Sequence, residues 1–314
     1  MSDTFEIERK ISEIEAEIVN LDHHRDQLLD ELKHYRRQLL QKDPPAQLML
    51  DIPGITVNNQ SSQEEKIRLF RSLFKGREDV FPRRFENSKT RKSGYTPVCR
   101  NEWQAGICQK PKIACQDCNF RAFVPISDEI IRNHLKGYDP NDRSGKDFTM
   151  GVYPLLADES CWFLAADFDK STWAEDAKTF LETCASYQVP AVLERSRSGN
   201  GGHVWIFFET PVPAVLARKL GALLLTSTMN RRPEIGMDSY DRLFPSQDTL
   251  PRGGFGNLIA LPLQKKPREQ NNSVFLDNDL NPYPDQWAFL ASIQKMTHQD
   301  LERIVKNVQD EDEI

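Results

Sequence analysis

Two aspartates, Asp167 and Asp169, stand two positions apart at the end of the apolar run CWFLAADF, residues 161–168. Such a run is typical of a buried strand. Side chains at i and i+2 of a strand project from the same face, with their Cα atoms roughly 6 to 7 Å apart. Carboxylate pairs of this kind bind Mg²⁺ or Mn²⁺, and two such ions can hold both oxygens of a phosphoryl displacement. The pair predicts a metal-dependent phosphoryl-transfer site; a helix cap or a solvated strand end is the alternative.

A glycine-rich segment, SRSGNGGHVW at 196–205, follows the next strand-like run, AVLER. Backbone amides of such a turn can surround a triphosphate, and an imidazole beside them can donate to a phosphate oxygen. An ordinary hairpin turn also requires Gly and Asn. We predict nucleotide contacts at Ser198, Gly199, Asn200, Gly201 and His203, and Gly202 lies in the same turn. Arg195 and Arg197 add positive charge nearby, and we predict that Arg195 also contacts the nucleotide.

A third carboxylate is expected in SYDRLFPSQDTLPRGGFGNLIALPL, residues 239–263, or just before it. The candidates are Asp238, Asp241 and Asp248. We predict that Asp248 completes the metal site.

Four of the six cysteines lie close together, with the spacing C-x8-C-x6-C-x2-C: Cys99, Cys108, Cys115 and Cys118. Four thiolates are what closed tetrahedral zinc sites use, so we predict structural zinc. An iron–sulfur cluster is the rival, since thiolates serve either metal, and free buried thiols are a third reading. Cys161 and Cys184 are expected to pack in the core.

An aromatic residue and several cations flank this cysteine cluster: Trp103 with Arg91, Lys92 and Arg100. A template strand could stack and be contacted there. Packing of Trp103 on the metal module is the alternative.

The chemistry-bearing residues fall on an alternating pattern of elements. We expect strands at 161–168, 191–195 and 203–208, helices at 172–187 and 211–229, and a further strand after them. A proline is allowed in the first turn of the second helix. The order is that of a split βαβ, ferredoxin-like unit, which leaves one sheet face free for a ligand. The fold class is therefore predicted as α+β.

The remainder of the chain predicts separate parts. Residues 4–42 repeat with a period of seven, which favours a coiled coil over a helical hairpin and predicts self-association or partner docking. Asp43-Pro44-Pro45 ends this helix. The expected parts are a coiled-coil helix at 1–43, a linker at 44–64, a basic module with the cysteine segment at 65–146, a catalytic module at 147–290, and a C-terminal helix with an acidic tail at 291–314.

Composition bounds the class of protein. The chain has 314 residues, 39% of them hydrophobic, and suggests about two domains. It has no run of roughly 18 apolar residues and no signal peptide, so we expect a soluble, cytoplasmic protein without a membrane partner. The net charge of −6 argues weakly against nucleic-acid binding. Lys66 to Arg100, however, carries eleven Lys or Arg against three acids, which is either a solvated face or a phosphate-tracking surface.

Three segments, AADFD, SGNGGHVWIFF and FPSQDTLPRGGFGNLIALPL, together resemble the three motifs of archaeo-eukaryotic primases. The resemblance is closest to the primase domain of TOTE conflict systems and to CRISPR-associated primase-polymerases, and it covers roughly residues 65–290. It implies an AEP-type catalytic core with an RRM/ferredoxin-like βαββαβ module. In the family, the first motif is the metal-binding pair, which lands on Asp167 and Asp169, and the third supplies a metal ligand, which lands on Asp248.

The second motif of the family binds the nucleoside triphosphate and lands on Ser198–His203. Here the chain has Gly201 where the wider family often has Ser. Further residues resemble the polar and basic positions that face the incoming nucleotide in the family, namely Arg252, Asn257 and Lys265.

The resemblance implies a DNA primase-polymerase. A 3'-hydroxyl attacks the α-phosphate of a nucleoside triphosphate, and positioning with electrostatics does most of the catalysis. Expected partners are DNA template and primer, with a helicase or CRISPR proteins as further possibilities. A metal-dependent nuclease and a non-catalytic nucleic-acid-binding adaptor are the alternatives. The first has little use for a triphosphate loop, and the second has little use for three carboxylates.

Overall fold

The computed structural model describes residues 57–87, 90, 92–142, 147–231, 239–250 and 253–312, together with five positions near the N-terminus. The chain divides into two compact units, Met1–Ile55 and Thr56–Ile314. In the first unit, the five described positions are helical and exposed: Arg9, Lys10, Glu17, Gln27 and Glu31. The rest of the predicted coiled coil lies outside the described residues, as do Asp238 and Arg252.

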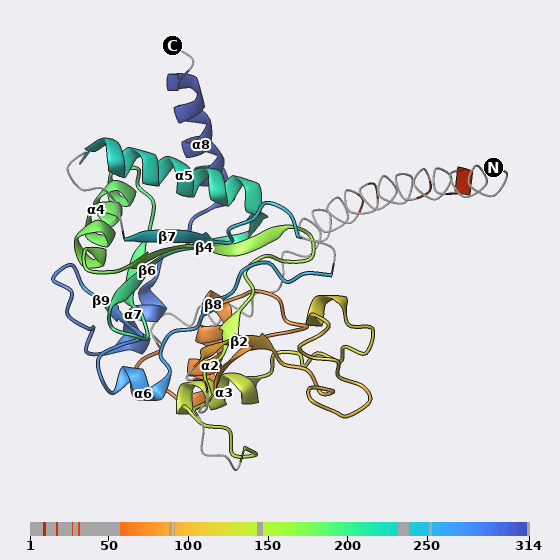
Figure 1. Ribbon diagram of the computed structural model, residues 1–314. Helices are drawn as coiled ribbons and strands as arrows, with labels where there is room; N and C mark the ends of the chain where they lie inside the picture. The colour runs from red at the N-terminus through yellow and green to blue at the C-terminus, as the bar shows by residue number, and fades with distance from the viewer. Residues whose placement is uncertain are drawn as a thin grey trace. The chain divides into compact units, whose positions relative to one another are not determined.

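The second unit is built on a five-stranded antiparallel sheet with the strand order β7-β4-β6-β5-β9. Two helices, α4 and α5, lie over one face of it (Figure 1). The order strand, helix, strand, strand, helix, strand that we expected is present. The elements are β4 (Ser160–Asp169), α4 (Trp173–Ser186), β5 (Val192–Arg195), β6 (Gly201–Pro213), α5 (Ala214–Arg231), β7 (Tyr240–Phe244) and β9 (Val274–Leu276).

The helix-covered face is held by close apolar packing. Phe168 of β4 packs against Phe180 of α4, with ring centroids 5.5 Å apart. A Cβ added at Gly221 of α5 would lie 2.7 Å from Leu243 and 3.0 Å from Leu164, so this glycine lets α5 approach the strands closely. Because side chains alternate along a strand, the neighbours of these residues, Asp167 and Asp169 among them, face the other side.

Two predicted boundaries are wrong. The helix expected from residue 211 begins at Ala214, and the strand expected over 203–208 runs from Gly201 to Pro213. The reason is the long partner strand: Ser160 pairs with Pro213 at one end of β4, and Asp169 pairs with Gly201 at the other. Strand pairing with β4 therefore overrides both the glycines and the prolines of β6.

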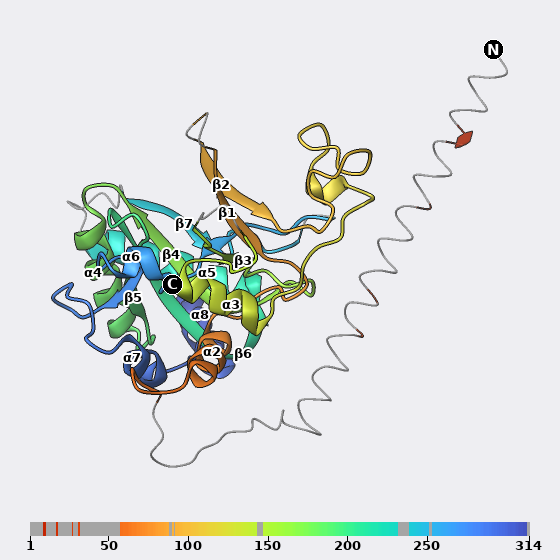
Figure 2. The same ribbon diagram turned by 90° about the horizontal axis from the view of Figure 1, so that it is seen from below.

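Several short elements complete the second unit. They are α2 (Gln63–Leu73), the hairpin β1 (Pro82–Glu86) and β2 (Ser93–Pro97), the 3₁₀ turn η1 (Cys115–Asp117), α3 (Asp128–Lys136), β3 (Gly151–Val152) paired with β8 (Ile259–Ala260), α6 (Lys265–Arg268), α7 (Gln286–Ser292) and α8 (His298–Asp312). The hairpin and the cysteine segment project from the same side of this unit (Figure 2). Within the described ranges, no helix combines the length and the apolar character needed to cross a bilayer.

The beginning of the second unit is anchored rather than extended. Ser62 caps α2 in a reciprocal capping box with Glu65, and the backbone amide of Asn59 donates to Asp285 at 2.7 Å. Phe74, which ends α2, meets Trp205 and Phe207 of β6 edge-on, with ring centroids 5.1 and 5.5 Å apart. The last part of the predicted 44–64 linker is thus packed structure, and α2 covers part of the sheet face opposite α4.

A buried histidine joins the small elements to the sheet region. His134 of α3 is fully buried, its Nε2 lies 2.9 Å from the Pro262 carbonyl, and its Nδ1 accepts from the Met150 amide at 3.1 Å. Burial lowers the pKa of His134 to about 4. The imidazole is therefore neutral, since a proton on Nδ1 would remove the acceptor for Met150.

Candidate active site

Three carboxylates gather where β4 ends beside β7. One oxygen from each of Asp167, Asp169 and Asp241 lies within 4.8 Å of the others, and no other such group occurs among the residues that the structure describes. Asp167 pairs with Arg242 of β7 and Phe168 pairs with Tyr240, so Asp241 is the extra residue of a β-bulge. A bulge bends its strand and re-aims a side chain. That distortion accounts for the third carboxylate facing the other two.

Asp241 takes the place that we expected for Asp248. Asp248 instead pairs with Arg218 of α5, with Nη1 2.5 Å from Oδ1, and it is not a member of the carboxylate group. The physical reason is that β7 ends at Phe244, so the chain has left the sheet before it reaches Asp248. A short interval in sequence separates the two candidates, but only one of them lies on a strand paired with β4.

A histidine and a glutamate extend the carboxylate group across the sheet. His203 of β6 is the direct partner of Asp167 on β4 and of Glu194 on β5. Its Nε2 lies 3.5 Å from Asp167 Oδ1, and its Nδ1 lies 2.7 Å from Glu194 Oε2. Trp205 donates to the same glutamate oxygen at 3.1 Å. The result is a continuous row from Glu194 through His203 to the metal-binding candidates.

Glu194 was not predicted from the sequence as a site residue. It is only 2% exposed, and a buried carboxylate requires partners. The available signal was an acidic residue in an otherwise apolar strand, AVLER, but its meaning depends on the pairing that sets it opposite His203.

The electrostatics of the row separate its acids and bases. Burial raises the pKa of Asp167 to about 6; the charge of His203 opposes this shift, and Asp169 and Asp241 add to it. For His203, burial alone would lower the pKa, but the charge and hydrogen bond of Glu194, with the charge of Asp167, outweigh it and raise the value to about 9. Carboxylates crowded in this way are relieved by a cation. The site therefore suits a divalent ion, with a protonated imidazole beside it.

The glycines next to His203 have a packing role. A Cβ at Gly201 would lie 2.5 Å from Asp169 Oδ1, and one at Gly202 would lie 2.7 Å from the Trp173 ring. Both residues belong to β6 rather than to the turn before it. Position 201 thus has no room for a side chain, because the Asp169 carboxylate fills that space.

The turn that precedes β6 comprises residues 196–200. Gly199 has a φ of 81°, and the Ser198 hydroxyl accepts from the Asn200 amide at 3.2 Å and meets Ser196 Oγ at 3.0 Å. Hydrogen bonds between its own residues therefore hold the turn in shape. It leads directly to Gly201, which is paired with Asp169, so any ligand of the turn lies near the carboxylates.

Three other predicted nucleotide contacts are engaged elsewhere in the protein. Arg195 alternates with Glu194 and donates to the carbonyls of Asn271 and Leu280, at 3.1 and 3.0 Å. Asn257 donates to the Leu243 carbonyl and accepts from the Ser246 amide, so it braces the chain after β7. Lys265 is exposed on α6, 3.7 Å from Glu269. The first two side chains hold loops in place, and none of the three joins the carboxylate group.

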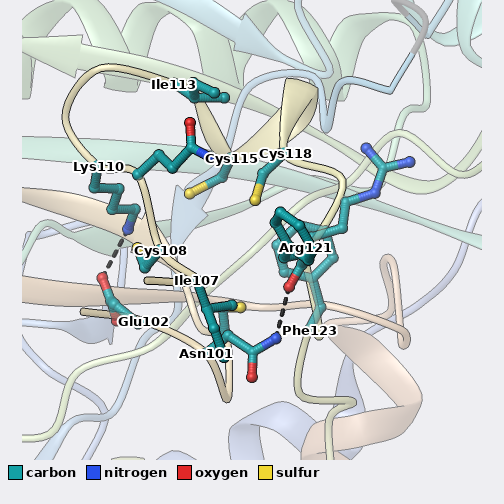
Figure 3. Close-up of a pocket in the computed structure, with 13 residues that line it drawn as sticks. Asn101, Glu102, Ile107, Cys108, Lys110, Ile113, Cys115, Cys118, Arg121 and Phe123 are labelled. Atoms are coloured by element: carbon teal, nitrogen blue, oxygen red, sulfur yellow. Dashed lines mark hydrogen bonds and ion pairs between the residues drawn. The ribbon is translucent and has the colours of Figure 1, made fainter. Parts of the chain in front are cut away.

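The four clustered cysteines, Cys99, Cys108, Cys115 and Cys118, line one pocket. Figure 3 shows the sulfurs of Cys115 and Cys118 directed toward the same space, with Lys110 bound to Glu102 at its edge. Burial raises the pKa of Cys115 against the opposing charge of Lys110. Although all four line the pocket, no three of these described sulfurs lie within 4.8 Å of one another. Cys161 and Cys184 are buried in the core, as predicted.

The carboxylate group, with His203 beside it on the α+β sheet, could hold a divalent metal ion. The family model of the TOTE conflict system archaeo-eukaryotic primase domain matches residues 65–304. The chain belongs to this family, and the resemblance drawn from its motifs is confirmed. Membership supports nucleotidyl transfer as the general class of reaction.

Among solved structures, the chain is similar to the polymerase domain of Mycobacterium tuberculosis ligase D in complex with DNA. The identity is 10% and the TM-score is 0.35, over 79% of this chain and 89% of that one. No curated protein matches.

Proposed function

We propose that this protein is a metal-dependent DNA primase-polymerase that transfers nucleotides from nucleoside triphosphates to a 3'-hydroxyl under the direction of a template. The observation that carries the proposal is the group of Asp167, Asp169 and Asp241 beside His203, inside a primase-family domain. Mg²⁺ or Mn²⁺ fits these ligands, because both ions prefer carboxylate oxygen.

The residues of the row have distinct roles in the proposed reaction. The 3'-hydroxyl gives up its proton to solvent, its oxygen bonds to the α-phosphorus, the bond to the bridging oxygen breaks, and pyrophosphate leaves. Divalent ions at the three aspartates would lower the pKa of the hydroxyl and offset the charge that develops on phosphorus. His203, kept protonated by Glu194, can donate to a phosphate oxygen on the same face. No residue needs to act as a covalent nucleophile.

Two further parts of the prediction fit this function. The sheet order β7-β4-β6-β5 supports an RRM/ferredoxin-like module, since the fourth strand lies beside the first. On the cysteine segment, Trp103 is 69% exposed and Phe120 is 53% exposed. Trp103 has a φ of 61°, a backbone conformation that non-glycine residues adopt at a cost. We propose that these exposed aromatic rings stack on bases of the template.

We also propose that the four cysteines bind structural zinc. Their thiolates are the donor set that zinc prefers, and all four line one pocket. Elemental analysis of the purified chain is expected to give one zinc ion, lost in Cys115→Ser and in Cys118→Ser but kept in the neighbouring control Asn119→Ser. Because the free energy of metal binding contributes to the stability of such modules, removal of the zinc by a chelator should also lower the melting temperature. Iron with visible absorption would favour the cluster instead.

The test of the proposed function is an incorporation assay with a labelled primer, a DNA template, nucleoside triphosphates and Mg²⁺ or Mn²⁺. Extension that depends on the template and stops on chelation is the expected result. Products formed without a primer would demonstrate priming. Degradation of the labelled strand without extension would identify a nuclease, and binding of DNA without either reaction would identify an adaptor.

A further inference from the structure

The β1–β2 hairpin carries three polar side chains on one face. Arg84 and Glu86 alternate along β1 and form an ion pair. Tyr95 on β2 lies directly opposite Arg84. The side chain of Arg84 is only 15% exposed, whereas that of Glu86 is 64% exposed. The carboxylate that neutralises this largely buried guanidinium therefore projects into solvent.

A second guanidinium reaches the same carboxylate from another part of the chain. Arg197 lies in the turn between β5 and β6, and its Nη2 is 4.0 Å from Glu86 Oε1. Arg84 and Arg197, which lie more than a hundred residues apart in the sequence, thus both pair with the carboxylate of Glu86. Glu86 itself is exposed, and ion pairs with an exposed carboxylate contribute little to stability. Stability alone is a weak reason for this convergence.

The arginine pair lies beside the proposed active site. Tyr95 is half-buried; its burial raises the pKa of the phenol, and the charges of Arg197, Arg84 and Glu194 all act on it. Glu194 in turn binds His203, which lies next to Asp167. The turn that holds Arg197 also leads into Gly201, the partner of Asp169. The hairpin and the glycine turn therefore face the same end of the sheet as the carboxylates.

We propose that Arg84 and Arg197 form a clamp for the β- and γ-phosphates of the incoming nucleoside triphosphate. Glu86 holds the two guanidinium groups when no nucleotide is bound, and the triphosphate displaces it. This inference rests on the proposed function, because it assigns the substrate of the same site.

The exchange is favourable for physical reasons. A triphosphate offers several charged oxygens to two guanidinium groups, whereas Glu86 offers a single carboxylate, and arginine–phosphate hydrogen bonds are strong and directional. Because Glu86 is exposed, its displaced carboxylate is hydrated at little cost. Glu86 therefore acts as a competitor that keeps the clamp assembled between rounds of substrate binding.

The test is the dissociation constant of a non-hydrolysable nucleoside triphosphate with Mg²⁺, measured by calorimetry on the full chain. Arg84→Gln and Arg197→Gln are each expected to weaken binding about tenfold or more, since hydrogen bonds between arginine and phosphate are among the strong ones. Glu86→Gln should tighten binding severalfold, because it removes the competitor. Arg303→Gln on α8, which loses an exposed ion pair with Asp300, is the matched control and should bind as wild type.

The opposite signs for Glu86 and the arginines separate this mechanism from a structural role, in which all three variants would weaken binding. A dissociation constant unchanged within twofold in Arg197→Gln, or weaker binding by Glu86→Gln, overturns the clamp. Should Arg84→Gln not fold, Arg197→Gln on the turn carries the test. Because the measurement needs no turnover, a wild-type chain that binds as expected but incorporates nothing would overturn the proposed function and leave the clamp standing.

Discussion

Replacing Asp241 with Asn is expected to lower the rate of nucleotide incorporation about a thousandfold or more, whereas Asp248→Asn should keep nearly the full rate. Metal ions held by carboxylates would stabilise charge in the transition state by several kcal/mol, and each 1.36 kcal/mol is a factor of ten. Asp241 shares its site with Asp167 and Asp169. Asp248 is engaged with Arg218 in a partly exposed pair. The two aspartates are therefore matched probes within one sequence motif.

The measurement is single-nucleotide extension under saturating Mg²⁺ and, separately, Mn²⁺, with melting temperatures to confirm folding. Each substitution removes one partly exposed ion pair: Asp241 pairs with Arg242, and Asp248 pairs with Arg218. The effects of the two substitutions on stability should therefore be similar and small. Activity is what separates them. An active Asp241→Asn together with an inactive Asp248→Asn would return the third ligand to Asp248.

The difficulty of choosing between these aspartates shows where sequence reasoning reaches its limit. Asp167 and Asp169 could be paired from sequence because strand geometry alone places i and i+2 on one face. The position of Asp241 beside this pair depends on a bulge in β7, and that bulge arises from the pairing of β7 with β4. Nothing local to SYDRLFPSQD distinguishes Asp241 from Asp248. Long-range strand pairing makes the choice.

Other residues follow the same rule. The order of strands and helices from 160 to 244 could be predicted because each element has a clear apolar pattern. Gly201 and Gly202 suggested a loop, but their backbone is paired along β4. Arg195 and Glu194 were both available in AVLER, and alternation in β5 puts the glutamate opposite His203 and the arginine against loop carbonyls. The sequence shows the type of each residue, but it does not show to which face of the sheet each side chain points.

The contribution of Arg84 and Glu86 could not be predicted for a further reason. They lie about eighty residues before the carboxylate pair, in a stretch whose positive charge alone does not distinguish a solvated face from a binding surface. The connection between the hairpin and the glycine turn is the ion pair between Glu86 and Arg197, which the three-dimensional structure brings together. In the proposed clamp, Arg84 is the cation of the basic stretch that serves the site.

Glu194→Gln is expected to lower incorporation at pH 8 by about a hundredfold or more, a loss comparable to removing one electrostatic donor. The carboxylate holds the pKa of His203 at about 9, above the ordinary value of 6.5, so His203 is protonated at pH 8 in the wild type. Without the Glu194 charge, burial is opposed only by Asp167 and Asp169, and the pKa falls. His203 in the variant then loses its proton at a lower pH than in the wild type.

The direction of the pH effect makes this prediction specific. The variant should recover activity relative to wild type as the pH is lowered from 8 to 6, because His203 regains its proton. Gln at 194 keeps an oxygen that can accept from Trp205, so the fold should be retained. Glu182→Gln, at an exposed position on α4, is the matched control and should follow the wild-type pH profile. An equal loss of activity at every pH would mean that Glu194 only orients the ring of His203. The charge of Glu194 would then not control the protonation of His203.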